Sequence, residues 1–250
     1  MSFMLSADPR PSLLIAARSY GASFRWHQIV RVALAAAVCS IALAGLGAAA
    51  SVEPPAPIKI VALGDSLTAG LGLADGDSFA TRLQAALAAK GVAVTVANAG
   101  VSGDTASAGL ARLDWSVPDG TDAVILELGA NDMLRGIDPK ATRDALDTIL
   151  HRLQERHIAI LLCGMRAAPN LGAEYGRAFE SIYPELAAKY GIPFYPFFLD
   201  GVAGNLGLLQ HDGMHPTPAG VDVIVARILP QVEDLLARAR SQHVHGERPS

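Results

Sequence analysis

Three residues in two distant segments have the types that nucleophilic hydrolysis requires. Ser66 lies in a Gly-Asp-Ser-Leu segment, and His215 follows Asp212 by three positions. A serine hydroxyl is a weak nucleophile that needs an imidazole to take its proton, and the imidazole needs a carboxylate to fix its tautomer. An aspartate three residues before a histidine can reach it across one tight turn, which Gly213 and Pro216 favour. Alone, each segment is equally compatible with a helix cap or a surface loop.

Two further segments contain groups that can stabilise a negative oxygen. Gly103 lies in a Gly-Val-Ser-Gly-Asp-Thr segment, where glycine lets the backbone approach a ligand closely and offer an N–H. Asn131 lies in a Gly-Ala-Asn-Asp segment, and its neutral amide carries two donor hydrogens. Each segment is also an ordinary loop or turn sequence, so neither is specific by itself.

The two histidines at positions 211 and 215 also permit a zinc interpretation, with Asp212 as a third ligand. Such a pair needs a helix to bring both rings to one face. Gly213 and Pro216 disfavour a helix, and no glutamate supplies a general base. The sequence therefore favours a site without a metal.

The elements that must position these residues alternate between short apolar runs and longer amphipathic ones. Strands without polar alternation, each followed by a helix, indicate a parallel sheet that is covered on both faces. We therefore expect one doubly wound α/β domain. The expected strands are Ile58–Leu63, Val92–Ala97, Ala123–Leu128, Ile158–Leu162 and Ile192–Tyr195, and the expected helices are Ser78–Lys90, Thr105–Leu113, Pro139–Arg156, Glu174–Tyr190 and Thr217–Arg240.

The order of the candidate residues matches this architecture. Ligands of such sheets bind beyond the carboxyl ends of the strands. Ser66, Gly103 and Asn131 follow the first three expected strands, and His215 precedes the last helix. In this order the four residues resemble the SGNH (GDSL-type) hydrolase family, whose name gives the one-letter codes of serine, glycine, asparagine and histidine. The resemblance covers roughly residues 59–231.

The resemblance implies both a fold and a site. The fold is a three-layer α/β/α, flavodoxin-like domain with a five-stranded parallel sheet. The catalytic set is Ser66, His215 and Asp212. The oxyanion hole consists of the main-chain N–H groups of Ser66 and Gly103 and the side chain of Asn131. No metal or organic cofactor is implied.

Longer matches resemble a periplasmic bacterial branch of the family that hydrolyses thioesters, lysophospholipids and aryl esters. The sequence departs from this branch near residues 166–172. Ala167, Ala168 and Pro169 there are candidates for lining the acyl channel, and they leave the acyl preference open. The matches are Ala62–Gly70, Gly129–Asp132, Ile182–Pro184, Pro196–Phe198 and Asp212–Pro216.

Residues 1–50 are typical of an export signal. Arg25 and Arg31 precede an uncharged run, Val32–Ala50, which ends in small residues of the kind that a signal peptidase accepts. Cleavage after Ala50 predicts a periplasmic or secreted protein with a flexible linker at 51–57, the hydrolase domain at 58–240 and a loose polar tail at 241–250. The alternative is an uncleaved anchor, because the run has about nineteen residues.

Charge and cysteine content limit the partners. After Ala50 the chain has sixteen basic and twenty-three acidic residues, so no basic stripe is present and nucleic acid is not an expected partner. Cys163 is expected to be a buried small hydrophobe in a chain without disulfides. The expected substrates are acyl esters, thioesters or lysophospholipids, and the expected state is a monomer. The alternatives are a carbohydrate O-deacetylase and a non-catalytic α/β binding module.

Overall fold

The computed structural model describes residues 56–244, so the predicted signal segment lies outside the described residues. Its centre is a five-stranded sheet in the order β2-β1-β3-β4-β5, and every neighbouring pair is parallel. This order confirms the predicted α/β class and is that of flavodoxin-like folds. The strands are β1 (Ile58–Gly64), β2 (Val94–Gly100), β3 (Ala123–Glu127), β4 (Ala159–Cys163) and β5 (Phe194–Tyr195).

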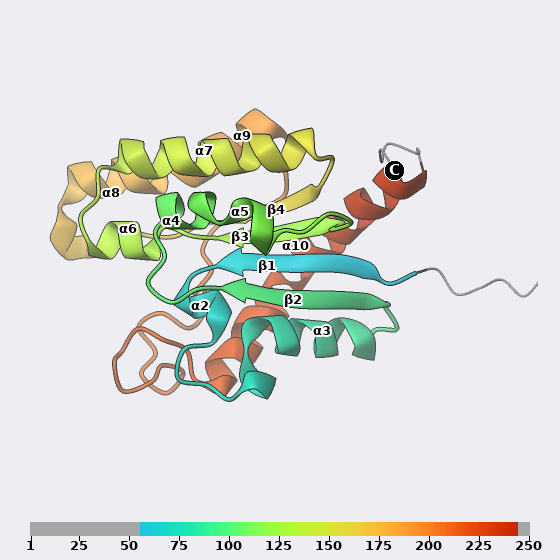
Figure 1. Ribbon diagram of the computed structural model, residues 1–250. Coiled ribbons are helices and arrows are strands. Elements are labelled where there is room, and N and C mark those ends of the chain that lie inside the picture. The colour runs from blue at the N-terminus through green and yellow to red at the C-terminus, as the bar shows by residue number, and fades with distance from the viewer. Residues whose placement is uncertain (1–55, 245–250) are drawn as a thin grey trace, which may run out of the picture. The chain divides into compact units, whose positions relative to one another are not determined.

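Helices lie on both faces of the sheet and give it three layers (Figure 1). They are α2 (Ser66–Ala69), α3 (Phe79–Ala89), α4 (Ala106–Ala111), α5 (Leu113–Ser116), α6 (Ala130–Leu134), α7 (Pro139–Glu155), α8 (Ala173–Glu180), α9 (Ile182–Tyr190) and α10 (Pro218–Val244), with 3-10 turns at Asp75–Asp77 and Pro169–Leu171.

Helices α3 and α10 pack together against one face, while α7 and α9 pack together against the other (Figure 1). Every residue of β3 and β4 is buried, and all of these residues except Glu127, at the end of β3, are apolar. Cys163, at the end of β4, is a free, buried thiol as predicted. Helix α7 turns one apolar stripe inward, and Asp138 caps it by accepting from the Lys140 N–H at 2.8 Å.

The predicted single helix over Glu174–Tyr190 is wrong, because the chain forms two helices that meet at Ser181. Pro184 provides the physical reason. It has no N–H to donate to the carbonyl of Glu180, and its ring crowds that carbonyl, so a continuous helix is disfavoured there. The division of this helix could therefore have been predicted from Pro184 in the sequence.

Other boundaries also differ from expectation. Strand β2 starts later than predicted and runs on to Gly100, β5 has only two residues, and the expected helix at Thr105–Leu113 is divided at Arg112. Helix α10 continues to Val244, so the first residues of the expected loose tail are helical. Within the part of the chain that the structure describes, no helix is long and apolar enough to cross a bilayer.

Candidate active site

The carboxyl ends of β1, β2 and β3 meet at one edge of the sheet. The register places Gly64 of β1 between Gly100 of β2 and Glu127 of β3. Ser66 and Asn131 therefore emerge beside each other, although they are 65 positions apart. Strands β1 and β3 are also the neighbours at which the strand order reverses, which is where ligands bind in doubly wound sheets.

Ser66, His215 and Asp212 form a continuous chain of contacts. His215 Nε2 lies 2.8 Å from Ser66 Oγ, and His215 Nδ1 lies 2.6 Å from Asp212 Oδ2. The other oxygen of Asp212 accepts from the main-chain N–H groups of Met214 at 2.9 Å and His215 at 3.0 Å. The loop before α10 thus brings an imidazole to Ser66, the first residue of α2, with a carboxylate behind it.

The environment of Asp212 decides the tautomer of His215. Hydrogen bonds from the main-chain N–H groups of His215 and Met214, together with the imidazole, lower the pKa of Asp212 to about 2. The carboxylate is therefore ionised at neutral pH and can only accept, so the proton of a neutral imidazole resides on Nδ1. Nε2 then carries the lone pair and can accept a hydrogen bond from the Ser66 hydroxyl.

The three predicted oxyanion-hole residues border the same cavity as His215. Gly103 has φ = +88°, a left-handed conformation that favours glycine, and its carbonyl accepts from Arg135 Nη2 at 2.7 Å. The main-chain N–H groups of Ser66 and Gly103 have no hydrogen-bond acceptor among residues 56–244. Both donors are therefore available to an oxygen in the cavity.

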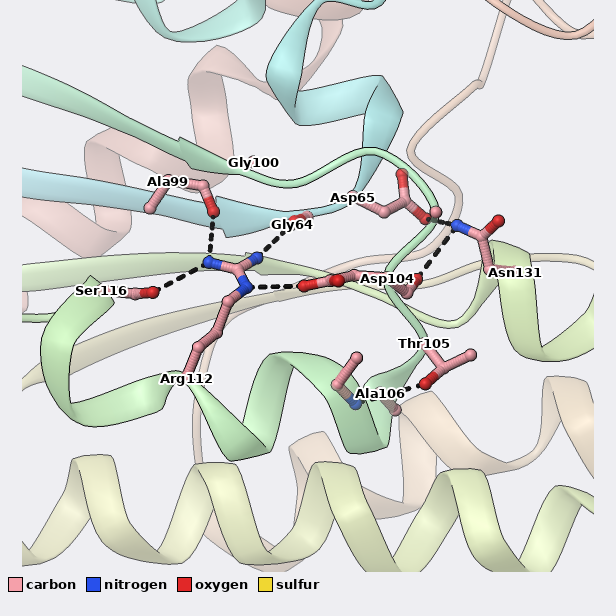
Figure 2. Close-up of polar contacts among 12 residues, drawn as sticks. Gly64, Asp65, Ala99, Gly100, Asp104, Thr105, Ala106, Arg112, Ser116 and Asn131 are labelled. Carbon is pink, nitrogen blue, oxygen red and sulfur yellow. Dashed lines mark hydrogen bonds and ion pairs between the residues drawn. The ribbon is translucent and has the colours of Figure 1, made fainter.

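Asn131 is held by acceptors on both sides. Its Nδ2 donates to Asp65 Oδ2 at 3.1 Å and to the main-chain carbonyl of Asp104 at 3.0 Å (Figure 2). Gly129, two residues earlier, has φ = +117°, and a Cβ there would lie 2.1 Å from the hydroxyl oxygen of Tyr183. Only glycine therefore permits the turn that brings Asn131 to the site.

The cavity has a volume of about 670 Å³ and a largely apolar lining. Of the three predicted channel residues, Ala168 and Pro169 line it, whereas Ala167 is not among the lining residues. The N–H of Ala167 instead donates to Glu180 Oε1 at 3.2 Å. The apolar lining comprises Leu67, Leu71, Ala130, Met133, Leu134, Met165, Ala168, Pro169, Phe197, Leu199, Ala203, Leu209 and Met214.

Two buried carboxyl groups behind Ser66 were missed by sequence reasoning. Asp65 caps α2 by accepting from the Leu67 N–H at 3.0 Å, and burial raises its pKa to about 6. Glu127 Oε2 accepts from the Thr68 hydroxyl at 2.8 Å, while its buried Oε1 has no hydrogen-bond partner among the described residues. Burial and the charge of Asp65 raise the pKa of Glu127 well above its usual range. In the sequence, Glu127 could have been noticed as an acidic residue at the end of an apolar strand.

We expect Glu127→Gln to make stability less sensitive to pH. Because the pKa of Glu127 is raised on folding, the folded protein binds protons more tightly, and the free energy of unfolding falls as pH rises above the unfolded-state pKa near 4.5. Glutamine is neutral at every pH. Between pH 4 and pH 7 the free energy of unfolding, measured with urea, should therefore change in favour of the variant over the wild type by about 1 kcal/mol or more. Glu174→Gln, at an exposed carboxylate, is the control. Parallel profiles for the Glu127 variant and the wild type would contradict this role.

The alternative zinc site is not formed. Both ring nitrogens of His215 are engaged, one by Asp212 and one by Ser66. His211 lines a neighbouring hollow instead. Over residues 56–244 no group of three or more histidine, cysteine and acidic side chains is placed to hold a metal ion.

Residues 62–223 match the GDSL-like Lipase/Acylhydrolase family. The chain belongs to this family. Over 178 residues this GDSL hydrolase is 36% identical to Esterase TesA of Pseudomonas aeruginosa, covering 71% of the chain and 89% of that protein. It is 34% identical to Thioesterase 1/protease 1/lysophospholipase L1 of Escherichia coli, covering 71% of the chain and 84% of that protein.

Solved structures agree with this assignment. The SGNH-hydrolase family esterase AlinE4 is 46% identical with a TM-score of 0.62, covering 74% of this chain and 99% of its own. The crystal structure of TesA is 35% identical with a TM-score of 0.68, and the match covers 71% of this chain and 99% of the TesA chain. These similarities confirm the predicted SGNH fold and the predicted class, a serine hydrolase of acyl esters and thioesters.

Proposed function

We propose that this GDSL hydrolase cleaves acyl esters, thioesters and lysophospholipids through a covalent acyl intermediate on Ser66. The observation that carries the proposal is the contact chain Ser66–His215–Asp212, with distances of 2.8 Å and 2.6 Å, at an apolar cavity. A nucleophile with an oriented base supplies the reactivity, and the cavity supplies a site for an acyl chain.

The reaction proceeds in two half-reactions. As Ser66 Oγ attacks the acyl carbonyl carbon, its proton passes to His215 Nε2, and the carbonyl oxygen becomes negative. The bond to the leaving alcohol or thiol then breaks, and His215 returns the proton to that group. Water attacks the acyl-enzyme in the same way, giving the carboxylic acid and free Ser66. Asp212 stays ionised throughout and stabilises the imidazolium.

Three donors would stabilise the negative oxygen. The N–H groups of Ser66 and Gly103 are free of acceptors among the described residues. Asn131 would share an Nδ2 hydrogen that the free enzyme directs to Asp65 or Asp104. Removing one donor of this kind typically costs about a hundredfold to a thousandfold in kcat.

The cavity lining favours an acyl substrate over an acetylated carbohydrate. Among the described residues, the polar side chains that line it are those of Ser66, Asn131, His215, Ser102 and Arg166. A sugar ring needs several convergent hydrogen-bond partners, whereas an alkyl chain needs apolar surface. The aligned Ser66 and His215 likewise favour an enzyme over a binding module.

A substrate panel tests the proposal. The purified protein is assayed with nitrophenyl esters of two to twelve acyl carbons, with acyl-CoA thioesters and with a lysophospholipid. We expect kcat/KM to peak at a medium or long chain. Activity on acetyl esters alone would favour the deacetylase. Inactivity on the whole panel, together with no labelling of Ser66 by a fluorophosphonate, would leave only the binding module.

The position of Ala168 at the cavity predicts a change in chain-length preference. Ala168→Leu should lower kcat/KM for a dodecanoyl ester about tenfold, because the larger side chain takes volume from the cavity, while acetyl ester hydrolysis changes less than about threefold. Ala167→Leu is the matched control, since this neighbour is not among the lining residues. An equal effect of both substitutions on all chain lengths would contradict the assignment.

Export and the monomeric state are further proposals. Export is supported by the composition of residues 1–50. Sequencing the mature N-terminus after expression with the full leader distinguishes a cleaved signal from an anchor. Light scattering of the purified mature protein measures its oligomeric state.

A further inference from the structure

One buried arginine joins the segments that carry the proposed oxyanion-hole donors. Arg112, between α4 and α5, is only 7% exposed. Its guanidinium donates four hydrogen bonds, which Figure 2 shows converging on it from several elements. Nε donates to Asp104 Oδ2 at 2.5 Å, Nη1 to the Ala99 carbonyl at 2.8 Å and to Ser116 Oγ at 2.9 Å, and Nη2 to the Gly64 carbonyl at 2.8 Å.

Three of these acceptors adjoin catalytic segments. Gly64 ends β1 two residues before Ser66, Ala99 lies near the end of β2, and Asp104 directly follows Gly103. The guanidinium therefore bridges the ends of two neighbouring strands and the loop that carries the Gly103 N–H. A planar group with donors in fixed directions is suited to this, whereas a lysine could not satisfy the same acceptors together.

The same network reaches Asn131. The main-chain carbonyl of Asp104 accepts from Asn131 Nδ2 at 3.0 Å, while the side chain of Asp104 accepts from Arg112 (Figure 2). Asp104 is thus held through its side chain by Arg112 and holds the amide of Asn131 through its backbone. Arg112 is therefore connected to all three proposed donors. It contacts Gly64, two residues before Ser66, and Asp104, which follows Gly103 and accepts from Asn131.

We propose that Arg112 is a positioning residue for the oxyanion hole. It orients the Gly103 N–H and the Asn131 amide so that both can donate to the carbonyl oxygen of a substrate bound at Ser66. The proposal rests on the proposed function, because it assigns these donors to an ester oxyanion. Donors stabilise a transition state only when they are aligned before the charge develops, and a displacement of about 1 Å can cost about a hundredfold in rate.

Helix α4 does not depend on Arg112 alone for its placement. The Ala106 N–H at its start donates to Asp132 Oδ2 at 2.9 Å, and Asp132 Oδ1 accepts from the Thr142 hydroxyl at 3.0 Å. These bonds anchor α4 independently to the segment after β3 and to α7. The contacts of Arg112 with Gly64 and Asp104 thus act mainly on the geometry of the site.

The first test is Arg112→Lys, assayed with a nitrophenyl ester that the wild type hydrolyses. We expect kcat to fall about thirtyfold to a hundredfold while KM changes less than about threefold, because a misaligned donor set weakens binding of the transition state more than that of the substrate. Arg156→Lys is the matched control. Arg156 also donates to a main-chain carbonyl, that of Val117 at 2.6 Å, but contacts no catalytic segment. Circular dichroism checks that each variant is folded.

Two readouts separate positioning from a purely structural role. In Arg112→Ala, added guanidinium should restore kcat at least about fivefold, whereas ammonium of equal concentration should not, because only the planar cation reproduces the fork of donors. In the Asn131→Ala background, Arg112→Lys should cost much less than in the wild type, because groups acting through the same donor are non-additive.

The outcomes distinguish this inference from the proposed function. A wild type that hydrolyses no ester or thioester would refute the proposed function. An active wild type with unchanged kcat in Arg112→Lys would refute only the positioning role. The positioning role would also be refuted if the loss of kcat in the double variant equalled the product of the losses in Arg112→Lys and Asn131→Ala, and guanidinium gave no rescue. The reduced cost in the double variant together with rescue would support it.

Discussion

Replacing Ser66 with alanine should lower kcat for ester hydrolysis about ten-thousandfold or more while the protein remains folded. In the proposed mechanism the acyl intermediate forms on Ser66 Oγ, which lies 2.8 Å from His215 Nε2, and alanine has no atom that could form this bond. The side chain fills little of the core, so stability should change by less than about 1 kcal/mol. Steady-state kinetics and thermal unfolding of the same preparation measure both effects.

Ser102→Ala provides the matched control for this experiment. Ser102 lines the same cavity, but the ring nitrogens of His215 face Asp212 and Ser66 and not Ser102. Removing the Ser102 hydroxyl should change kcat less than about threefold, because a serine without a base is a poor nucleophile. If Ser66→Ala kept wild-type activity while Ser102→Ala lost it, the nucleophile would have been assigned to the wrong hydroxyl.

Asp212→Asn should lower kcat about a thousandfold to ten-thousandfold, although it changes only one atom. In the structure one oxygen of Asp212 accepts from two main-chain N–H groups and the other faces His215 Nδ1. The single oxygen of an asparagine is best placed on the two N–H groups, which turns its NH₂ toward Nδ1. Nδ1 must then accept, so the ring proton moves to Nε2, which can no longer take the proton of Ser66.

The control for this prediction is Asp144→Asn, which removes an exposed carboxylate on α7 that pairs with Lys140. It should leave kcat unchanged within about twofold, since exposed ion pairs contribute little and the helix is distant in the sequence from the loop that carries His215. A loss of less than tenfold in Asp212→Asn would show that the imidazole is oriented by something other than this carboxylate.

The strands and the spacing of the candidate residues could be predicted because they follow from local composition. The apolar runs of β1, β3 and β4 have no polar alternation, which is typical of strands covered on both faces. Ser66 and Asn131 follow two of these runs, and parallel strands bring their carboxyl ends to one edge. Proximity of these residues therefore followed from the pattern, before any contact was known.

The polar network behind the site could not be predicted in this way. Arg112 falls in the expected helix Thr105–Leu113, and Glu127 ends an otherwise apolar strand; charged side chains are ordinarily solvated. Their burial depends on which segments cover them, and their partners lie up to 62 positions away in the chain. The cost of burying a charge is met only by acceptors that the completed fold brings together.

The sequence by itself determined the fold class, the family and the candidates for nucleophile, base and carboxylate, because these depend on residue type, order and periodicity. Only the tertiary structure decided that Ala168 rather than Ala167 borders the cavity, and that Asn131 is held between Asp65 and Asp104. It also decided that Arg112 bridges two strand ends. These facts depend on side-chain direction and long-range packing, which neighbouring residues in the chain do not specify.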